Sequence, residues 1–434
     1  MKTFYSNFSN TLSGTFRVPG DKSISHRSIM LGSLAKGTTT VTGFLEAEDA
    51  LSTLKAFQSM GVKIEQPSVG QVKIHGVGLR GLKQAENDIY LGNSGTSMRL
   101  LAGLLAGQSF DTVLTGDASL TKRPMRRVLD PLSSMGARVE SSEKGTAPLT
   151  IKGGFNLSPI DYEMPMGSAQ VKSCLLLAGL YAKGITKVTE PTITRDHTEQ
   201  MLKGFGYKVE RVGYTVSIEG GGELTATDID VPGDISSAAF LIVAACITEG
   251  SDITLKHVGV NPTRTGVIDI LLQMGANINL ENRQVIGGEQ VADIRIKSSQ
   301  LKGIEIPDEL VALAIDEFPV LFIAAAYAEG TTILSGAAEL RVKESDRISA
   351  MADGLHRVGV DAQATDDGMI IKGGSVTGGI VESFDDHRIA MAFAVAGLRS
   401  EKLIQINNCE NVNTSFPGFV ELANECGFKI KYNE

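Results

Sequence analysis

The chain has 434 residues, with 41 Lys and Arg against 50 Asp and Glu, and a formal net charge of -9 at pH 7. This acidity gives no support to a nucleic-acid-binding role, and an anionic substrate would need a local basic pocket that acts against the overall charge. The length predicts a soluble protein of two or three domains.

The cysteines and the apolar segments exclude further classes. The four cysteines have no CxxC spacing and indicate neither disulfides nor a zinc site. This pattern fits a protein of the reducing cytoplasm. The N-terminal sequence MKTFYSNFSNTLSG is too polar for a signal peptide. The longest apolar run, residues 238–247, is too short to span a membrane.

One pattern is repeated six times along the chain: a turn opens an apolar helix, a short strand follows, and an amphipathic helix leads to another strand. In chain order, the apolar helices are predicted to begin near Ser23, Ser94, Ser168, Ser236, Ile315 and Asp385, and to end at Gly37, Gly107, Gly184, Gly250, Gly330 and Ser400. The amphipathic helices are predicted to end at Gly61, Gly136, Gly206, Gly275, Gly359 and Gly427. A period of roughly 66 to 80 residues predicts a repeat architecture of the α/β class.

The two helix types are predicted to lie in different surroundings. The first helix of each repeat is apolar on nearly every face, which is typical of a helix buried all round. The second helix has one polar face and should lie nearer solvent, with its final Gly as a left-handed cap. The strands that follow, such as VKIE, ARVE and FKIK, alternate in polarity and should be half exposed.

The sequence VPGD occurs twice, at residues 18–21 and 231–234, each time directly before an apolar helix. We interpret these segments as two crossings between domains of three repeats each. One domain would comprise residues 21–231, and the other would comprise residues 1–20 joined to 232–434. A double crossing makes a hinge, and hinges close clefts around ligands, so the active site is expected in the cleft at the crossings.

Cations are predicted at the starts of the apolar helices, where the positive helix end disfavours them unless an anion is bound. They are Lys22, Arg27, Arg99, Lys172 and Arg388, and the connecting segments add Arg123, Arg195, Lys343 and Arg347. Each one alone could be an ordinary surface cation. Their repetition favours a site for strongly anionic small molecules.

Three local segments allow two interpretations each. Asp316 and Glu317 precede Phe318-Pro319 and could cap a helix, although a cap can also serve as a base. The run from Lys343 to Arg347 could be a solvated first turn. His387 and Arg388 could be a capped helix start with a surface charge.

Seven motifs in this order carry a family resemblance: PGDKSISHR, LGNSGTSMR, KRP, GSAQ, PGDISSAAF, RVKESDR and DDHR. Together they cover essentially the whole chain, and they resemble the 5-enolpyruvylshikimate-3-phosphate (EPSP) synthase family. The resemblance implies two domains, each of three βαβαββ repeats. The sequences SAQ and MRLL are more similar to the glyphosate-tolerant bacterial branch.

The resemblance also implies the reaction, in which the enolpyruvyl group of phosphoenolpyruvate passes to the 5-hydroxyl of shikimate 3-phosphate and phosphate is released. This step belongs to the shikimate pathway of aromatic amino acid biosynthesis. It needs no metal or cofactor, and it is the target of glyphosate. We expect a cytoplasmic monomer, with neither nucleic acid nor membrane as a partner.

Residue roles follow from the resemblance position by position. Asp316 is implied as the base for the 5-hydroxyl, and Glu344 as the proton donor with Lys22 assisting; a donor needs a raised pKa, which the surrounding cations oppose. The shikimate 3-phosphate ligands would be Lys22, Ser23, Arg27, Ser168, Ala169, Gln170, Arg195, Asp316 and Lys343. The phosphoenolpyruvate ligands would be Lys22, Gly95, Arg123, Gln170, Arg347 and Arg388. The pocket would be shaped by Asn93, Thr96, Arg99 and His387.

The chain departs from part of the family at three places. The segment before Phe416-Pro417 has no Lys, Glu339 stands where some members have Asn, and Leu100 replaces Pro.

Two alternatives remain open. A UDP-N-acetylglucosamine enolpyruvyl transferase would share the fold and the donor, but that family has a loop Cys, and no Cys precedes Gln170 here. A non-catalytic protein that binds a phosphorylated metabolite would not need both Asp316 and Glu344.

Overall fold

The computed structural model describes residues 2–433 and divides into two compact units. Unit 1 comprises the described residues of Met1–Pro19, Pro232–Val285 and Gln290–Glu434, and unit 2 comprises Gly20–Val231 together with Ile286–Glu289. The chain therefore crosses between the units at residues 19–20 and 231–232, and the short segment 286–289 of unit 1's chain is grouped with unit 2.

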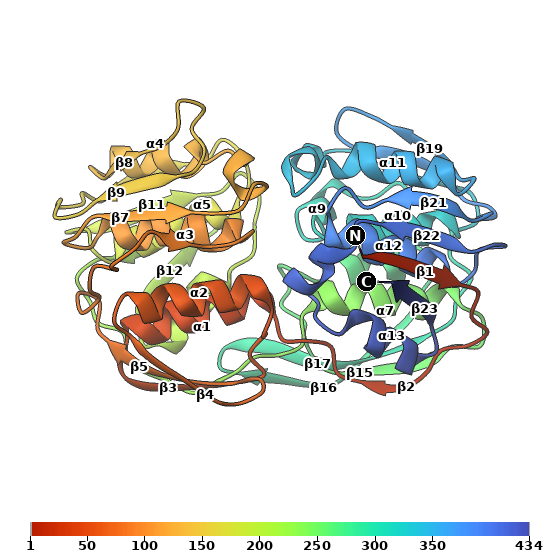
Figure 1. Ribbon diagram of the computed structural model, residues 1–434, viewed down its shortest axis with the longest axis horizontal. Helices are drawn as coiled ribbons and strands as arrows, with labels where there is room; N and C mark the ends of the chain where they lie inside the picture. Colours follow the sequence, from red (N-terminus) through yellow and green to blue (C-terminus); the bar gives the residue numbers. More distant parts are fainter. Residues whose placement is uncertain (1, 434) are drawn as a thin grey trace. The chain divides into compact units, whose positions relative to one another are not determined.

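Unit 2 contains three βαβαββ repeats (Figure 1). Its apolar helices are α1 (Lys22–Leu34), α3 (Gly95–Ala106) and α5 (Ala169–Gly179), and its amphipathic helices are α2 (Glu48–Ser59), α4 (Arg126–Ser134) and α6 (His197–Gly204). Its strands are β3 (Lys36–Thr42), β4 (Lys63–Ser68), β5 (Gln71–Val77), β6 (Ile89–Tyr90), β7 (Thr112–Thr115), β8 (Arg138–Glu140), β9 (Leu149–Lys152), β10 (Asp161–Glu163), β11 (Ile185–Thr189), β12 (Val209–Val212), β13 (Thr215–Glu219) and β14 (Ile229–Asp230), with the short helix η1 (Leu120–Lys122).

The three sheets of unit 2 have the orders β14-β3-β5-β4, β6-β7-β9-β8 and β10-β11-β13-β12. In each sheet the first pair of strands is parallel and the other pairs are antiparallel. The first sheet takes its parallel strand, β14, from the end of the unit's chain. The repeat that begins with α1 is thus completed by residues that immediately precede the second crossing.

Unit 1 repeats the arrangement. Its apolar helices are α7 (Ile235–Ile247), α10 (Phe318–Ala326) and α12 (His387–Ala396), and the others are α8 (Gly266–Gln273), α9 (Asp308–Val311), α11 (Arg347–Arg357), α13 (Phe419–Cys426), η2 (Ala338–Val342) and η3 (Glu410–Thr414). Its strands are β1 (Thr3–Asn7), β2 (Ser13–Phe16), β15 (Asp252–Gly259), β16 (Asn277–Ile286), β17 (Glu289–Lys297), β18 (Thr331–Leu334), β19 (Asp361–Ala364), β20 (Met369–Lys372), β21 (Gly379–Glu382), β22 (Ile404–Asn407) and β23 (Lys429–Asn433).

The sheets of unit 1 have the orders β16-β17-β15-β2, β18-β20-β19 and β21-β22-β1-β23. The N-terminal segment contributes to two of them, since β2 lies parallel to β15 and β1 lies antiparallel between β22 and β23. In the sheet of β18, parallel bridges from Lys302 to Glu329 and from Glu305 to Ile333 take the place of a first strand. The predicted α/β fold of six repeats is confirmed.

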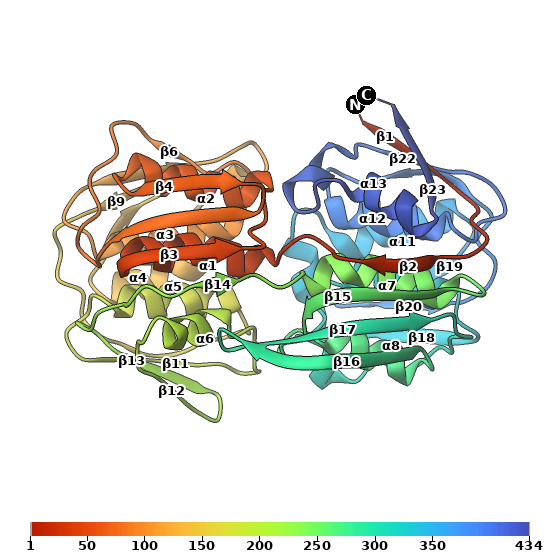
Figure 2. The ribbon, with the colours of Figure 1, turned by 90° about the horizontal axis from the view of Figure 1, so that it is seen from below.

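The apolar helices form the interior of each unit. In Figures 1 and 2 the sheets of each unit lie at its periphery, and α3 packs on α5 just as α10 packs on α12 and α7. Every residue of α7, α10 and α12 is buried, as the sequence pattern predicts. The close approach of α3 and α5 depends on Gly103, because a Cβ there would lie 2.1 Å from the Cys174 carbonyl oxygen.

The predicted helix ends are only partly confirmed. The glycines after the amphipathic helices do have a positive φ, such as 86° at Gly61 and 87° at Gly359. Among the apolar helices, α3 ends as predicted, with Gly107 as its C-cap, but the others end earlier: α1 ends at Leu34, and Gly37 already lies in β3. After α1 the chain enters the sheet within two residues, whereas a short turn follows the other apolar helices.

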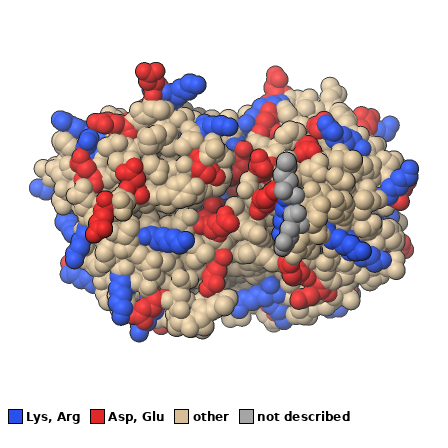
Figure 3. Space-filling view, in the orientation of Figure 1, with Lys and Arg blue, Asp and Glu red and all other residues tan. Residues whose placement is uncertain are grey.

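The helix lengths and the surface charges are the remaining features of the fold. No helix within residues 2–433 has both the length and the apolar character needed to cross a membrane. On the face shown in Figure 3, acidic and basic side chains are interspersed over each unit.

We predict that Gly103→Ala destabilises the protein by about 1–3 kcal/mol, because the added methyl group forces α3 and α5 apart. The matched control is Gly204→Ala at the end of α6, where the nearest atom to the new methyl would be 3.5 Å away. This control should leave stability unchanged or raise it by up to about 1 kcal/mol. Urea denaturation monitored by circular dichroism measures both, and equal midpoints for the two variants would contradict the packing argument.

Candidate active site

Polar side chains gather where the buried helices begin. Asp21 accepts a hydrogen bond from the Ile24 amide at 2.8 Å, Ser94 from the Ser97 amide at 3.1 Å, and Asp386 from the Arg388 amide at 2.9 Å. These caps satisfy amides that a buried helix end would otherwise leave without a partner. The start of α10 differs: Glu317 occupies the cap position and makes no capping hydrogen bond, so the predicted alternative of a cap at Asp316 is wrong.

Arg27 in α1 is held between three helices of unit 2. Its Nε donates to Thr198 Oγ1 at 2.7 Å, its Nη2 donates to Ser173 Oγ at 2.9 Å, and its Nη1 donates to the Ser23 carbonyl at 3.0 Å. The residue is only 5% exposed, and burial lowers the pKa of its guanidinium to about 10. All three acceptors are neutral, so this buried positive charge is suited to an anionic ligand.

Lys22 lies one turn before Arg27, and its Nζ is 3.1 Å from Asp49 Oδ2. Its side chain is 21% exposed, which leaves the ammonium accessible. Ser23, also half-buried, follows it at the start of α1. The structure therefore brings Lys22, Ser23 and Arg27 together on the first two turns of one helix, as predicted.

Gln170 joins the starts of α3 and α5. Arg99 Nη1 donates to Gln170 Oε1 at 2.6 Å, and Gln170 Nε2 donates to Thr96 Oγ1 at 3.0 Å. Arg99 Nη2 also donates to the Pro124 carbonyl at 3.2 Å, close to Arg123. Ser168 caps α5 through the Val171 amide, and Ala169 is its first residue. These contacts fix the orientation of the Gln170 amide.

Two guanidinium groups approach Gly95. A Cβ at this position would lie 3.0 Å from Arg123 Nη1 and 3.1 Å from Arg99 Nη1. Arg123 Nη2 donates to Asn93 Oδ1, while Asn93 Nδ2 donates to Asp117 Oδ2 at 2.8 Å. Glycine therefore leaves space beside two cations, and the predicted pocket residues Asn93, Thr96 and Arg99 do lie around it.

Lys172 was predicted to belong to the anion site, and this prediction is wrong. Its side chain is fully buried, and its Nζ lies 3.0 Å from Glu190 Oε1 and 2.8 Å from Glu199 Oε1. Two carboxylates already neutralise it. Glu190 also accepts a hydrogen bond from the Thr194 amide at 3.1 Å, which anchors the segment that carries the half-buried Arg195.

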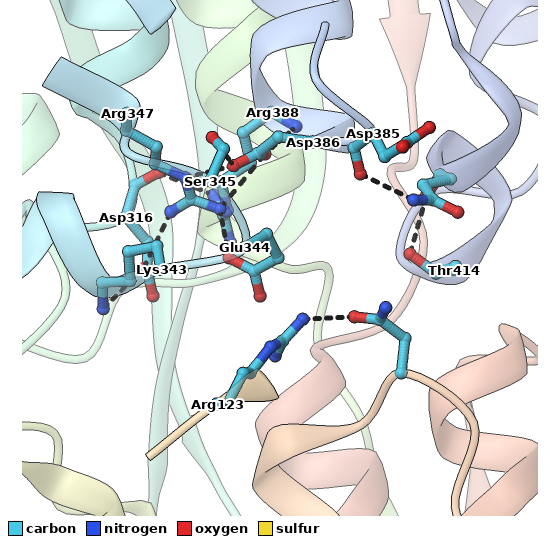
Figure 4. A network of polar contacts seen from close by, with 12 residues as sticks. Arg123, Asp316, Lys343, Glu344, Ser345, Arg347, Asp385, Asp386, Arg388 and Thr414 are labelled. Atoms are coloured by element: carbon cyan, nitrogen blue, oxygen red, sulfur yellow. Dashed lines mark hydrogen bonds and ion pairs between the residues drawn. The ribbon is translucent and has the colours of Figure 1, made fainter. Parts of the chain in front are cut away.

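In unit 1, Arg347 lies at the centre of a cluster of carboxylates (Figure 4). Its Nε is 2.8 Å from Asp386 Oδ2, its Nη2 is 2.7 Å from Glu344 Oε2, and its Nη1 is 3.4 Å from Asp316 Oδ1. Lys343 Nζ lies 3.3 Å from the same Asp316 oxygen. The predicted alternative of a solvated first turn is wrong for Arg347, whose side chain is 1% exposed.

The charges of this cluster stabilise one another. Burial alone would raise the pKa of Asp386, but the Arg347 guanidinium outweighs this effect and holds the pKa below its ordinary value. Burial alone would lower the pKa of Arg347, and the carboxylates of Asp386 and Glu344 raise it instead. Asp386 and Arg347 therefore form a permanent buried ion pair, whereas Asp316 and Glu344 remain partly exposed.

Arg388 and His387 open α12 beside this cluster. Arg388 Nη1 donates to the Asp316 carbonyl at 2.9 Å and lies 3.7 Å from Glu317 Oε1. His387 is 5% exposed and Arg388 is 9% exposed, so the predicted alternative of a surface charge is wrong. Arg388 thus contacts the cluster through the backbone of Asp316, and His387 is buried beside it in the chain.

Thr414 occupies the segment that lacks the family's Lys. Its Oγ1 donates to the Asn411 carbonyl at 2.7 Å, and Asn411 Nδ2 donates to the Asp385 carbonyl at 2.6 Å (Figure 4). Phe384 and Asp385 have φ values of 53° and 57°, in the left-handed region. The segment thus supports the turn before α12 with neutral groups and brings no cation.

The comparisons with known proteins decide the family. The sequence model of the EPSP synthase (3-phosphoshikimate 1-carboxyvinyltransferase) family matches residues 7–422. The chain belongs to the EPSP synthase family. It is 64% identical to the 3-phosphoshikimate 1-carboxyvinyltransferase of Methylococcus capsulatus, over 97% of this chain and 96% of the relative.

Solved structures agree with this assignment. An EPSP synthase from Acinetobacter baumannii is 58% identical to this chain, with a TM-score of 0.91 and complete coverage of both chains. The enolpyruvyl transferase NikO from Streptomyces tendae is 16% identical, with a TM-score of 0.79 over 100% of this chain and 99% of its own, and shows a shared fold.

Sequence reasoning did not single out His26, which links three helices of this EPSP synthase family member. Its Nδ1 lies 2.7 Å from Thr53 Oγ1, and that hydroxyl lies 2.6 Å from Ser97 Oγ. His26 is fully buried, and burial, followed by the charges of Lys22 and Arg27, lowers its pKa well below 6.5. The sequence could have indicated this residue, because a histidine lies here inside an apolar helix close to the cations Lys22 and Arg27.

The structure predicts a pH dependence of stability from His26. The unfolded state takes up a proton near pH 6.5, whereas the folded state stays neutral, so stability is fully present above this pH and falls as the pH drops. Relative to wild type, His26→Asn should flatten this fall by up to about 1.4 kcal/mol per pH unit. Urea denaturation between about pH 5 and 8 measures the free energy of unfolding of both proteins. For each protein, the value at each pH is compared with its own value at the highest pH. Parallel profiles of the two proteins would contradict the assignment.

Proposed function

We propose that this chain is a 3-phosphoshikimate 1-carboxyvinyltransferase. It transfers the enolpyruvyl group of phosphoenolpyruvate to the 5-hydroxyl of shikimate 3-phosphate and releases phosphate, a step of the shikimate pathway. Family membership over residues 7–422 supports the reaction. The observation that carries the mechanism is the partly exposed Asp316 carboxylate, which lies between Lys343 and Arg347 beside Glu344.

The ligands of the two substrates are proposed from the family pattern and the local geometry. Those of shikimate 3-phosphate are Lys22, Ser23, Arg27, Ser168, Ala169, Gln170 and Arg195 in unit 2, with Asp316 and Lys343 in unit 1. Those of phosphoenolpyruvate are Lys22, Gly95, Arg123 and Gln170 in unit 2, with Arg347 and Arg388 in unit 1. Because each set is divided between the units, we propose that both units contribute to one active site during turnover. The crossings at residues 19–20 and 231–232 would then serve as the hinge.

Asp316 is the proposed base. The neighbouring cations Lys343 and Arg347 stabilise its carboxylate form, which can accept the proton of the 5-hydroxyl. The resulting alkoxide attacks C2 of phosphoenolpyruvate. Guanidinium groups that bind the phosphate and the carboxylate of phosphoenolpyruvate stabilise the charge that develops.

Glu344 is the proposed proton donor. A proton added to the methylene carbon completes a tetrahedral intermediate, which then loses phosphate while a proton returns from the new methyl group to the protein. Before substrate binds, Glu344 Oε2 forms an ion pair with Arg347 Nη2 at 2.7 Å. Bound phosphoenolpyruvate competes for the same guanidinium, and this competition allows Glu344 to take up the proton that it donates. Lys22 assists on the other substrate face.

We further propose that the enzyme acts as a monomer in the cytoplasm, without a metal or an organic cofactor. The four free and buried cysteines are compatible with a reducing compartment. The polar outward faces of the amphipathic helices support the monomer.

Replacement of the base tests the mechanism. Asp316→Asn should lower the rate of phosphate release by about 10²–10⁴-fold, because the amide cannot accept the hydroxyl proton. Phosphate release from phosphoenolpyruvate is measured with shikimate 3-phosphate and, in parallel, with UDP-N-acetylglucosamine.

The wild-type control separates the three functions. Release with shikimate 3-phosphate alone supports the proposal, and release with the nucleotide sugar alone identifies the related transferase. Tight binding of shikimate 3-phosphate without any release would identify a non-catalytic binding protein.

Inhibition by glyphosate tests the space at Gly95. Gly95→Ala places a methyl group about 3 Å from Arg123 and Arg99, which should raise the inhibition constant by at least about tenfold. Gly204→Ala is the control for a methyl group far from the site. The inhibition constant is measured against phosphoenolpyruvate, and an unchanged value in Gly95→Ala would contradict the assignment of this pocket.

A further inference from the structure

Glu317, next to the proposed base, is a buried carboxylate that the mechanism does not use. Its side chain is 1% exposed, its Oε1 accepts a hydrogen bond from Ser236 Oγ, and it makes no capping hydrogen bond to α10. Its Oε2 is buried and has no hydrogen-bond partner among residues 2–433. A buried acceptor without a partner is unfavourable for folding. Stability alone therefore does not explain a glutamate at this position.

On one side, Glu317 is connected to the second crossing between the units. Arg264 Nη2 lies 2.6 Å from Ser236 Oγ and 2.9 Å from Asp234 Oδ1, and 4.0 Å from Glu317 Oε1. The Asp234 amide donates to the Pro19 carbonyl at 2.9 Å, so the two crossing segments are bonded to each other at this residue. All four side chains of this network are buried.

On the other side, Glu317 faces the reacting groups. Its Oε1 lies 3.7 Å from Arg388 Nη1, and the same nitrogen donates to the Asp316 carbonyl at 2.9 Å. Glu317 also follows Asp316 directly in the chain. The Glu317 carboxylate is thus in contact with an arginine that also binds the backbone of the proposed base.

We propose that Glu317 is a positioning residue. It fixes Arg388, the proposed ligand of phosphoenolpyruvate, and Asp316, the proposed base for the acceptor hydroxyl, in their positions relative to the crossing segment at residues 231–234. Its single negative charge lies between two buried guanidinium groups, those of Arg264 and Arg388. Without that charge the two cations repel each other, and Arg388 leaves its position on the Asp316 carbonyl. This inference rests on the proposed function, because the family pattern assigns Arg388 to phosphoenolpyruvate.

Glu317→Gln tests the proposal, since it keeps the shape and the acceptor for Ser236 but removes the charge. The KM for phosphoenolpyruvate should rise by about tenfold and kcat should fall, because small displacements of a positioning group reduce both. The KM for shikimate 3-phosphate should change by less than about twofold, since most of its proposed ligands lie in unit 2. An unchanged or lowered KM for phosphoenolpyruvate would overturn the proposal. A lowered KM would mean that Glu317 only competes with phosphoenolpyruvate for Arg388, so that removal of its charge releases the arginine for binding.

Two further variants distinguish positioning from lost stability. Ile406→Val in β22 removes a buried methyl group in the sheet of β1 and none of the polar contacts of Glu317, and should lower the melting temperature without a change in either KM. Ser236→Ala removes the hydrogen bond to Glu317, and should raise the KM for phosphoenolpyruvate in the same direction. If Glu317→Gln does not fold, the KM of Ser236→Ala alone tests whether Glu317 positions Arg388.

The outcomes for the two proposals are separate. A wild-type enzyme without phosphate release refutes the proposed function. An active wild type, combined with unaltered kinetics in Glu317→Gln and Ser236→Ala, refutes only the positioning role.

Discussion

Burial of the apolar helices on every side is the constraint on which the rest of this structure depends. A helix that touches only apolar neighbours along its length can present polar groups only at its ends. In α1, α3 and α12 amides of the first turn are satisfied by Asp21, Ser94 and Asp386, and the cations of the proposed site lie within the first two turns. The site follows from this geometry, since the starts of the buried helices are where charge can be both held rigidly and reached.

The cations at these helix starts differ in how their charge is compensated. Lys172 has two carboxylates within 3.0 Å and is a structural residue. Arg347 shares its charge between Asp386, which is permanently ionised, and the partly exposed Glu344 and Asp316. Arg27 donates its hydrogen bonds to hydroxyl and carbonyl oxygens, which suits its proposed role as a ligand of shikimate 3-phosphate. The carboxylates around Lys172 are themselves buried, whereas two of those around Arg347 are partly exposed, and this difference in access separates the structural cation from the proposed ligand.

The sequence predicted the fold well because helix burial and repeat length are local properties of the pattern. Six apolar helices and the left-handed glycines at Gly61 and Gly359 could be read from spacing alone. The partners of charged side chains could not, because they come from distant positions: Lys172 pairs with Glu190 and Glu199, which the local pattern around α5 does not indicate. The same holds for Arg264 and Glu317, which lie 4.0 Å apart although they belong to different repeats. The sequence also did not predict that the tip of the β16–β17 hairpin, residues 286–289, groups with unit 2. This grouping depends on tertiary contacts such as that of His197 with Glu289, which local patterns do not show.

A crystal structure of the protein with shikimate 3-phosphate bound tests the central claim most directly. The account predicts that the anionic groups of the ligand lie against the first turns of α1 and α5, within hydrogen-bond distance of Lys22, Ser23, Arg27 or Ser168. Lys172 should keep its two carboxylate partners in that complex. A ligand bound elsewhere, with these helix starts unoccupied, would contradict the view that the cations at the starts of the buried helices make the site.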